Sequence, residues 1–194
     1  MFVNLSNGKS FSGGSLNPEI ILPIILMIAI VQTVKLVRNH SSIVKIILVW
    51  AFYFYLYKVI SLTLFPIGWF DSNSAIHNYP FGMQNMTELN PMKWLSYSKF
   101  QIFGNILLLM PLTFIGGIIF PKMRSLSKAV TVSFLVSLLI EISQLTLNYF
   151  YLGNRSFDTG DLLLNTIGGL IGYLFLKLFF KVFPAKTVNK ILSK

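Results

Sequence analysis

The chain has 194 residues, of which 54% are hydrophobic and only 11% are charged, and its mean hydropathy is +0.69. A soluble domain carries about 25% charged residues, so this composition excludes an ordinary soluble domain and indicates an integral membrane protein. The chain has no cysteine, which excludes disulfides, thiolate catalysis and cysteine-based metal sites. Its two histidines, His40 and His77, lie in different segments, which argues against a histidine-rich zinc site.

The first 42 residues contain a polar segment and one apolar run. Residues 1–17 carry a single cation and two adjacent glycines, and we expect them to form a flexible extracellular tail. The apolar run 18–37 begins after Asn17-Pro18, a helix cap followed by a first-turn proline. Residues 18–42 are therefore predicted to be an additional N-terminal transmembrane helix with a basic connector.

The second apolar run, 43–65, is rich in aromatic residues and ends at Phe65-Pro66. The following segment, 66–100, mixes aromatic residues with turn residues, a composition typical of a loop in the membrane interface. We expect this loop to be extracellular and to contain a short amphipathic or re-entrant piece.

Three further apolar runs follow, at 101–120, 129–147 and 161–183, and a lysine-bearing segment ends the chain. A helix needs about 20 apolar residues to cross a membrane. The fold class is therefore predicted to be all-α, a polytopic membrane helix bundle with about five transmembrane helices. Residues 43–183 would form a four-helix membrane domain, and residues 184–194 a basic cytoplasmic tail.

The distribution of charge predicts the orientation of the bundle. The three connectors on one side carry three, three and five of the sixteen Lys and Arg residues and no acid. Lys and Arg accumulate in short cytoplasmic loops, so the N-terminus is predicted outside and the C-terminus in the cytoplasm. The net charge of +10 is then a topogenic signal, and nucleic acid is not an expected partner.

Isolated polar residues occur on three of the predicted helices at similar depth. With a helix rise of about 1.5 Å per residue, they fall within about two turns of the predicted outer surface. The short loop 148–160, which carries an arginine and an aspartate, lies above them. Polar groups in hydrocarbon are costly and point to a functional or helix-joining role. These residues are Asn105, Glu141, Gln144 and Asn165, with Arg155, Asp158 and Asp161 in or beside the loop.

Four stretches of the sequence resemble the VanZ-like family of bacterial membrane proteins, known for teicoplanin resistance. The stretches are SLTLFP (61–66), NILLLMPLTFIGG (105–117), SLLIEISQL (137–145) and NRSFDTGDLLLNTIGGLIGY (154–173). The family pattern pairs Glu-x-x-Gln with Arg-x-x-Asp-x-x-Asp-x-x-x-Asn before a glycine-rich helix, and this chain has the pattern intact. The resemblance covers about residues 45–180 and implies a role at the cell envelope in the bacterial plasma membrane, without implying a mechanism.

Glu141 and Arg155 are the candidate functional residues, and each has two interpretations. Glu141 could join helices by bonding Asn105, Gln144 or Asn165, or it could face an outward cavity as a proton acceptor or ligand group. Arg155 could clamp the loop through Asp158 and Asp161, or bind an anionic headgroup or pyrophosphate. A divalent cation held by Glu141 and the two aspartates is a further alternative. Gly168, Gly169 and Gly172 are predicted to form a close-packing helix face.

Two functions lead at this level, ahead of a structural scaffold and of a small ion-coupled transporter, which ranks last because the inner half of the helices is almost wholly apolar. The first is a binding or modulating protein with an outward-facing polar pocket. It would handle outer-leaflet lipids, a lipid-linked cell-wall precursor or a lipoglycopeptide, and so lower susceptibility to teicoplanin. The second is a membrane hydrolase or transferase on a lipid-linked substrate, with Glu141 as acid or base and Arg155 on the phosphate. No cofactor or metal is expected, and the sequence does not indicate an oligomeric state.

Overall fold

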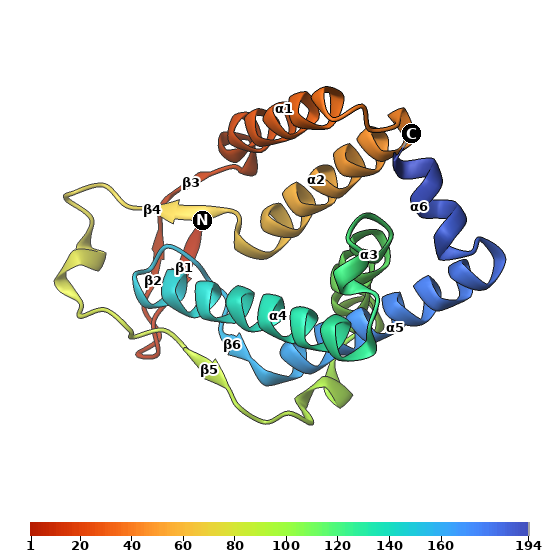
Figure 1. Ribbon diagram of the computed structural model, residues 1–194. Coiled ribbons are helices and arrows are strands. Elements are labelled where there is room, and N and C mark those ends of the chain that lie inside the picture. The colour runs from red at the N-terminus through yellow and green to blue at the C-terminus, as the bar shows by residue number, and fades with distance from the viewer. Residues whose placement is uncertain (194) are drawn as a thin grey trace.

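Five long helices form the body of the protein in the computed structural model, which describes residues 1–193 (Figure 1). All five are long and apolar enough to cross a membrane, which confirms the predicted all-α polytopic bundle. The helices are α1 (Leu22–Arg38, preceded by the 3₁₀ turn Pro18–Ile21), α2 (Ile43–Leu64), α3 (Lys99–Ile119), α4 (Leu126–Tyr149) and α5 (Thr159–Val182). A short sixth helix, α6, spans Ala185–Ser193.

Side-chain caps define where four of these helices begin. Ser42, Ser98 and Ser125 precede α2, α3 and α4, and each hydroxyl accepts a hydrogen bond from the backbone N–H three residues on, at 3.2, 3.2 and 3.3 Å. Asp158 caps α5 and accepts from the N–H of Gly160 at 2.7 Å. Such caps satisfy amides that have no partner inside the helix. The ends of the membrane helices are therefore set by individual residues as well as by hydropathy.

Helix α5 packs closely against α3 and α4 through its glycines. A Cβ atom added at Gly168 or Gly172 would overlap the backbone carbonyl of Ile106 or Met110 on α3, and one at Gly169 would overlap Ser133 on α4. This confirms the predicted close-packing face. Small residues let helix backbones approach in a membrane, where no hydrophobic force drives helices together.

Residues 1–17 are ordered strands, which differs from the flexible tail expected from the sequence. Strands β1 (Phe2–Asn4) and β2 (Ser10–Ser12) form a hairpin, and β3 (Gly14–Leu16) pairs antiparallel with β4 (Ile67–Trp69). Val3 and Leu5 are buried with Ile76 and Tyr151 in a small apolar cluster. The physical reason is that this segment covers apolar side chains contributed by distant parts of the chain.

The segment 66–100 folds as strands and single turns. It contains β4, the 3₁₀ turns Ala75–Asn78 and Lys93–Ser96, and β5 (Thr87–Glu88). Strand β5 pairs parallel with β6 (Phe157–Asp158), which directly precedes α5. Figure 1 shows the strands toward the left of the molecule. Between β4 and the start of α3 at Lys99, no helix longer than one 3₁₀ turn is present among the described residues, so the expected amphipathic or re-entrant piece is not found.

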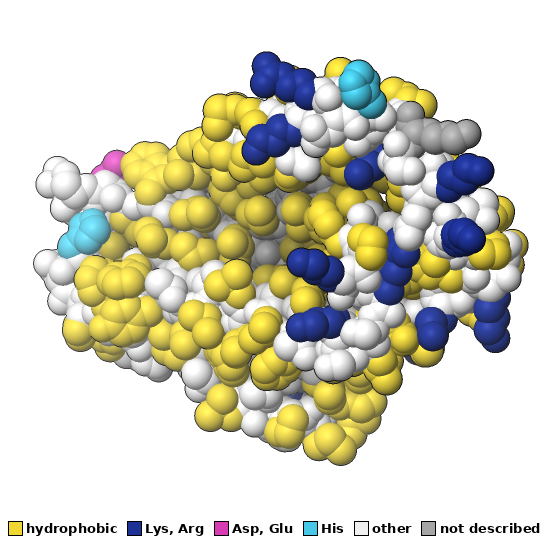
Figure 2. Space-filling view, in the orientation of Figure 1, with side chains coloured by type: hydrophobic (Ala, Val, Ile, Leu, Met, Phe, Trp, Pro, Cys, Tyr) yellow, Lys and Arg dark blue, Asp and Glu magenta, His cyan; other side chains and the backbone are white. Residues whose placement is uncertain are grey.

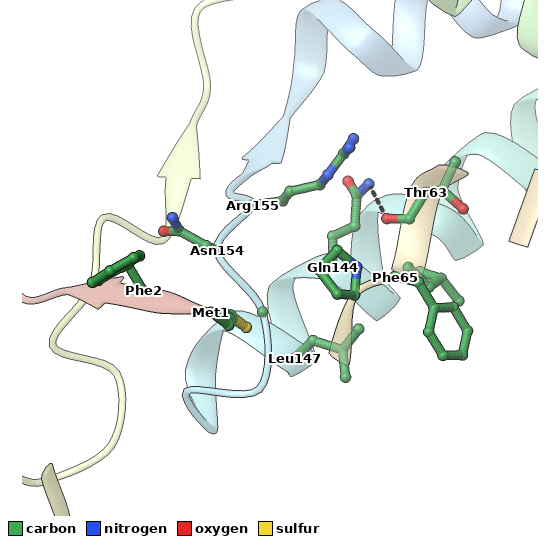
Figure 3. Close-up of a pocket in the computed structure, with 11 residues that line it drawn as sticks. Met1, Phe2, Thr63, Phe65, Gln144, Leu147, Asn154 and Arg155 are labelled. Atoms are coloured by element: carbon green, nitrogen blue, oxygen red, sulfur yellow. Dashed lines mark hydrogen bonds between the residues drawn. The ribbon is translucent and has the colours of Figure 1, made fainter. Parts of the chain in front are cut away.

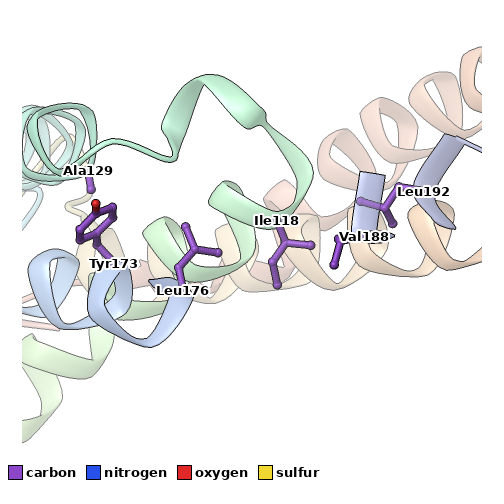
Figure 4. Packing of buried hydrophobic residues seen from close by; sticks show 6 residues of the cluster. All are labelled: Ile118, Ala129, Tyr173, Leu176, Val188 and Leu192. Carbon is purple, nitrogen blue, oxygen red and sulfur yellow. The ribbon is translucent and has the colours of Figure 1, made fainter. Parts of the chain in front are cut away.

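The basic segment 184–194, expected as a tail, instead folds as helix α6 over its described residues. Val188 and Leu192 lie one turn apart on α6 and are buried against Ile118 of α3 and Leu176 of α5 (Figure 4). The Arg124 guanidinium donates to the carbonyls of Gly117 and Ile118 and to Asn189 on α6. Lys and Arg side chains gather at this end of the molecule (Figure 2). This is the asymmetry on which the predicted orientation depends.

Candidate functional site at the strand-bearing end of the bundle

Glu141 lies on α4 and is fully enclosed by protein. Its side chain is only 1% exposed, and Oε2 accepts a hydrogen bond from the backbone N–H of Asp158 at 2.8 Å. Asp158 is the cap of α5, so this bond fixes the start of α5 against α4. The helix-joining interpretation of Glu141 therefore fits the geometry, although the partner is a backbone amide and not one of the expected side chains.

Asp158 is held by three further contacts. Oδ1 accepts from the N–H groups of Gly160, at 2.7 Å, and Asp161, at 3.4 Å, while Oδ2 accepts from the hydroxyl of Tyr97. Burial raises the pKa of Tyr97, and the hydrogen bond to the Asp158 carboxylate raises it further. Tyr97 thus remains a neutral donor that ties the loop before α3 to the start of α5.

Asp161 and Asn165 continue the polar row along α5. The Asn105 amide on α3 donates to Asp161 Oδ1, which joins α3 to α5. The Asn165 amide, 1% exposed, donates to Ser137 Oγ on α4 at 3.0 Å. Interhelical hydrogen bonds of this kind hold transmembrane helices together. Both residues have helix-joining partners on neighbouring helices.

Gln144 lies one turn beyond Glu141 and is 6% exposed. Its amide nitrogen donates to the carbonyl oxygen of Thr63, in the last turn of α2, at 2.9 Å. The bond joins α4 to α2. Gln144 also lines a cavity that Arg155 lines as well.

Arg155 makes no ion pair with any described residue. Within the described residues 1–193, the one pair of opposite charges closer than 4.0 Å is Lys93 with Glu88, at 2.7 Å. The predicted clamp between Arg155 and the aspartates is therefore wrong: neither Asp158 nor Asp161 forms an ion pair with Arg155, and Asp158 bonds Tyr97 and the α5 amides. The Arg155 side chain is exposed.

A cavity of about 370 Å³ lies beneath Arg155, between the end of α2, the last turns of α4 and strand β1. The guanidinium of Arg155 extends toward the amide of Gln144 across this cavity (Figure 3). Asn154 adds a polar group, whereas the remaining wall is largely apolar. The apolar lining includes Met1, Phe2, Leu64, Phe65, Pro66 and Leu147. Glu141 does not line the cavity.

The carboxylates do not form a metal site. Among residues 1–193, no group of three His, Asp or Glu side chains has the spacing to hold a metal ion. The proposed set of Glu141, Asp158 and Asp161 is directed to hydrogen bonds with amides and with Tyr97 and Asn105. The structure thus brings six of the seven predicted residues into helix-joining contacts, and it places Arg155 at a cavity with Gln144.

Sequence reasoning missed several members of this polar network. Asn148 lies on the buried face of α4, seven residues after Glu141, and bonds Gln84 and the carbonyl of Asn85. Its spacing on the helix could have identified it. Tyr97 and Gln84 lie in the irregular segment 66–100, where no periodicity is present to identify them.

Fold and site together define a multi-pass helical membrane protein with a hydrogen-bonded polar layer at the strand-bearing end. The VanZ/LLP1 family model matches residues 52–180, which is more than half of the chain. The chain therefore belongs to the VanZ/LLP1 family, and the matched range contains all seven predicted site residues. No curated protein and no solved structure matches the chain.

Proposed function

We propose that this protein binds an anionic, lipid-linked molecule of the bacterial cell envelope in the cavity beneath Arg155. By binding or modulating outer-leaflet lipids, it lowers the susceptibility of the cell to teicoplanin-type lipoglycopeptides. The protein acts in the bacterial plasma membrane, with its N-terminus outside and its C-terminus in the cytoplasm.

The observation that carries this proposal is the Arg155 guanidinium at the cavity, which has no acidic partner within 4.0 Å among residues 1–193. A guanidinium recognises phosphate and carboxylate groups through parallel N–H donors. Gln144 and Asn154 add polar groups beside it, while Phe65 and Leu147 offer an apolar wall. This combination suits the junction of an anionic headgroup with a hydrocarbon chain.

The distribution of charge supports an outward-facing cavity. The connectors 39–42 and 120–125 and helix α6 lie at the end of the bundle opposite the strands, and cations gather there (Figure 2). Such an end faces the cytoplasm in most membrane proteins. The cavity lies at the other end, within reach of lipid headgroups of the outer leaflet.

The geometry favours binding over the alternative of a hydrolase or transferase. An acid or base must come within hydrogen-bond reach of the substrate. Glu141 is 1% exposed, accepts from the N–H of Asp158 and lies outside the cavity lining. Its position fits a residue that holds α5 in place.

The test is the susceptibility of cells to teicoplanin and vancomycin with wild-type protein, Arg155→Ala, Arg155→Lys, Glu141→Gln or no protein. We expect the wild type to raise the teicoplanin concentration that stops growth, Arg155→Ala to abolish this effect, and Glu141→Gln to retain it. Arg155→Lys keeps the charge but loses the paired donors, so an intermediate value is expected. No teicoplanin shift in wild-type cells would refute the resistance role, and loss of the shift in Glu141→Gln at normal protein level would favour the enzyme.

A further inference from the structure

A second hollow opens on the side of the bundle between α2 and α3. This groove has a volume of about 490 Å³ and is lined almost wholly by apolar side chains. Val59 and Leu62 form its α2 wall, and Phe103, Leu107 and Pro111 form its α3 wall. It lies in the half of the membrane that contains the end of α2 and the start of α3.

The groove has a gap in its α3 wall at Gly104. A Cβ atom added at this glycine would meet no atom within 4 Å, whereas one at Gly168 would overlap the backbone of α3. Glycine inside a helix is about 1 kcal/mol less favourable than alanine. Close packing of protein therefore does not explain Gly104, and the space in front of it is open to a partner molecule.

Lys58 provides the one charged group of the groove lining. It lies inside α2, six residues before the helix ends, which places its backbone about 9 Å below that end. Its side chain is exposed, and among the described residues no acid lies within 4.0 Å of it. The ammonium lies 5.6 Å from the ring centre of Phe54 and 5.7 Å from that of Tyr57.

A cation at this depth requires a partner, and a lipid phosphate is the anion within reach. A lysine in a membrane helix extends toward the interface, where the phosphates lie. Hydrocarbon fills the space beside the helices, and an apolar groove of this shape accommodates a hydrocarbon chain. The charge of Lys58 and the apolar lining thus complement the two parts of one phospholipid.

We propose that the α2–α3 groove binds an acyl chain of a diacyl phospholipid whose phosphate contacts Lys58, with a preference for lipids of net negative charge. This site is separate from the Arg155 cavity, since the two linings share no residue. Shape and charge, and not a general hydrophobic effect, give the selectivity, because bulk lipid is equally apolar.

The experiment is native mass spectrometry of the full chain in detergent, titrated with phosphatidylglycerol or phosphatidylcholine. Gly104→Leu adds a side chain to the groove at a position where a Cβ atom meets no other atom within 4 Å, and Lys58→Gln removes the charge. Ala51→Leu adds similar bulk, one carbon less, to an exposed position of α2 outside the groove lining, and Lys99→Gln removes an exposed cation at the start of α3. These two variants are the matched controls.

We expect Gly104→Leu to weaken phosphatidylglycerol binding by about tenfold or more, because the added side chain occupies the chain site. Lys58→Gln should weaken it by about fivefold and abolish the preference over phosphatidylcholine, and both controls should bind as the wild type does. Phosphatidylglycerol binding that survives Gly104→Leu would overturn the proposal. A dimer that Gly104→Leu disrupts, with lipid binding unchanged, would also overturn it, because a second copy would then occupy the groove.

Discussion

Two substitutions of Glu141 distinguish its two possible roles. The residue either holds α5 in place through a hydrogen bond or transfers protons. Its Oε2 accepts the N–H of Asp158 at 2.8 Å inside the bundle. Glu141→Gln keeps a carbonyl oxygen at this position, so the hydrogen bond can be retained. Glu141→Ala removes the acceptor and leaves the buried N–H without a partner.

The expected costs of the two variants differ clearly. A buried N–H without a partner costs about 1–3 kcal/mol, and the cavity left by the truncated side chain adds about 1–2 kcal/mol. Glu141→Ala should therefore lower the free energy of unfolding by about 3 kcal/mol. Glu141→Gln should cost less than about 1 kcal/mol, since the carbonyl continues to accept the bond.

The assay is unfolding in mixed micelles of dodecyl maltoside and sodium dodecyl sulfate, combined with hydrogen exchange of the Asp158 amide. We expect Glu141→Ala to unfold at a lower sodium dodecyl sulfate fraction and to lose protection at Asp158. Glu141→Gln should resemble the wild type in both measurements. Equal destabilisation by the two substitutions, or an Asp158 amide that exchanges at the same rate in all three proteins, would refute the assigned role.

Three further predictions concern other parts of the structure. Gly168→Leu should destabilise the bundle by about 3 kcal/mol or more in the same micelle assay, because its side chain would overlap the Ile106 carbonyl. The pKa of Tyr97 is raised on folding, so the stability it contributes is present below its ordinary pKa of about 10 and is lost as pH rises through the higher folded value. Stability measured above pH 10 should therefore fall less steeply in Tyr97→Phe than in the wild type. Arg124→Gln removes donors to three acceptors, so proteolysis between α5 and α6 should accelerate severalfold, and unchanged cleavage would contradict the docking role.

The sequence predicted the five transmembrane helices because each is a long apolar run between polar connectors. It also predicted that Glu141, Asn105 and Asp161 lie near one end of the bundle, since depth follows from helix rise. The Asn105–Asp161 bond joins two of these residues across α3 and α5. Distance along the membrane normal is thus readable from a sequence when the helix ends are clear.

The sequence did not show which groups these residues bond to or pack against. Glu141 bonds a backbone amide, which is present at every residue and leaves no mark on the sequence. Strand β1 is too short for periodicity to reveal. Val188 and Leu192 lie one turn apart on α6, but their spacing does not show which distant residues they pack against. The Arg155 clamp was inferred from proximity in sequence, which does not show that Asp158 bonds Tyr97 and that Arg155 lies at a cavity instead.

The pairing of β3 with β4 has a consequence for the order in which the protein assembles. The two strands lie on either side of α1 and α2 in the sequence, so both helices must cross the membrane before the strands can meet. At the other end the same helices are joined by the connector 39–42, and between them Trp50 donates to Thr33 at 2.9 Å. The β3–β4 pairing thus joins the two ends of the segment that contains α1 and α2. It can form only after both helices have crossed the membrane, so the paired strands mark the completion of the first two crossings.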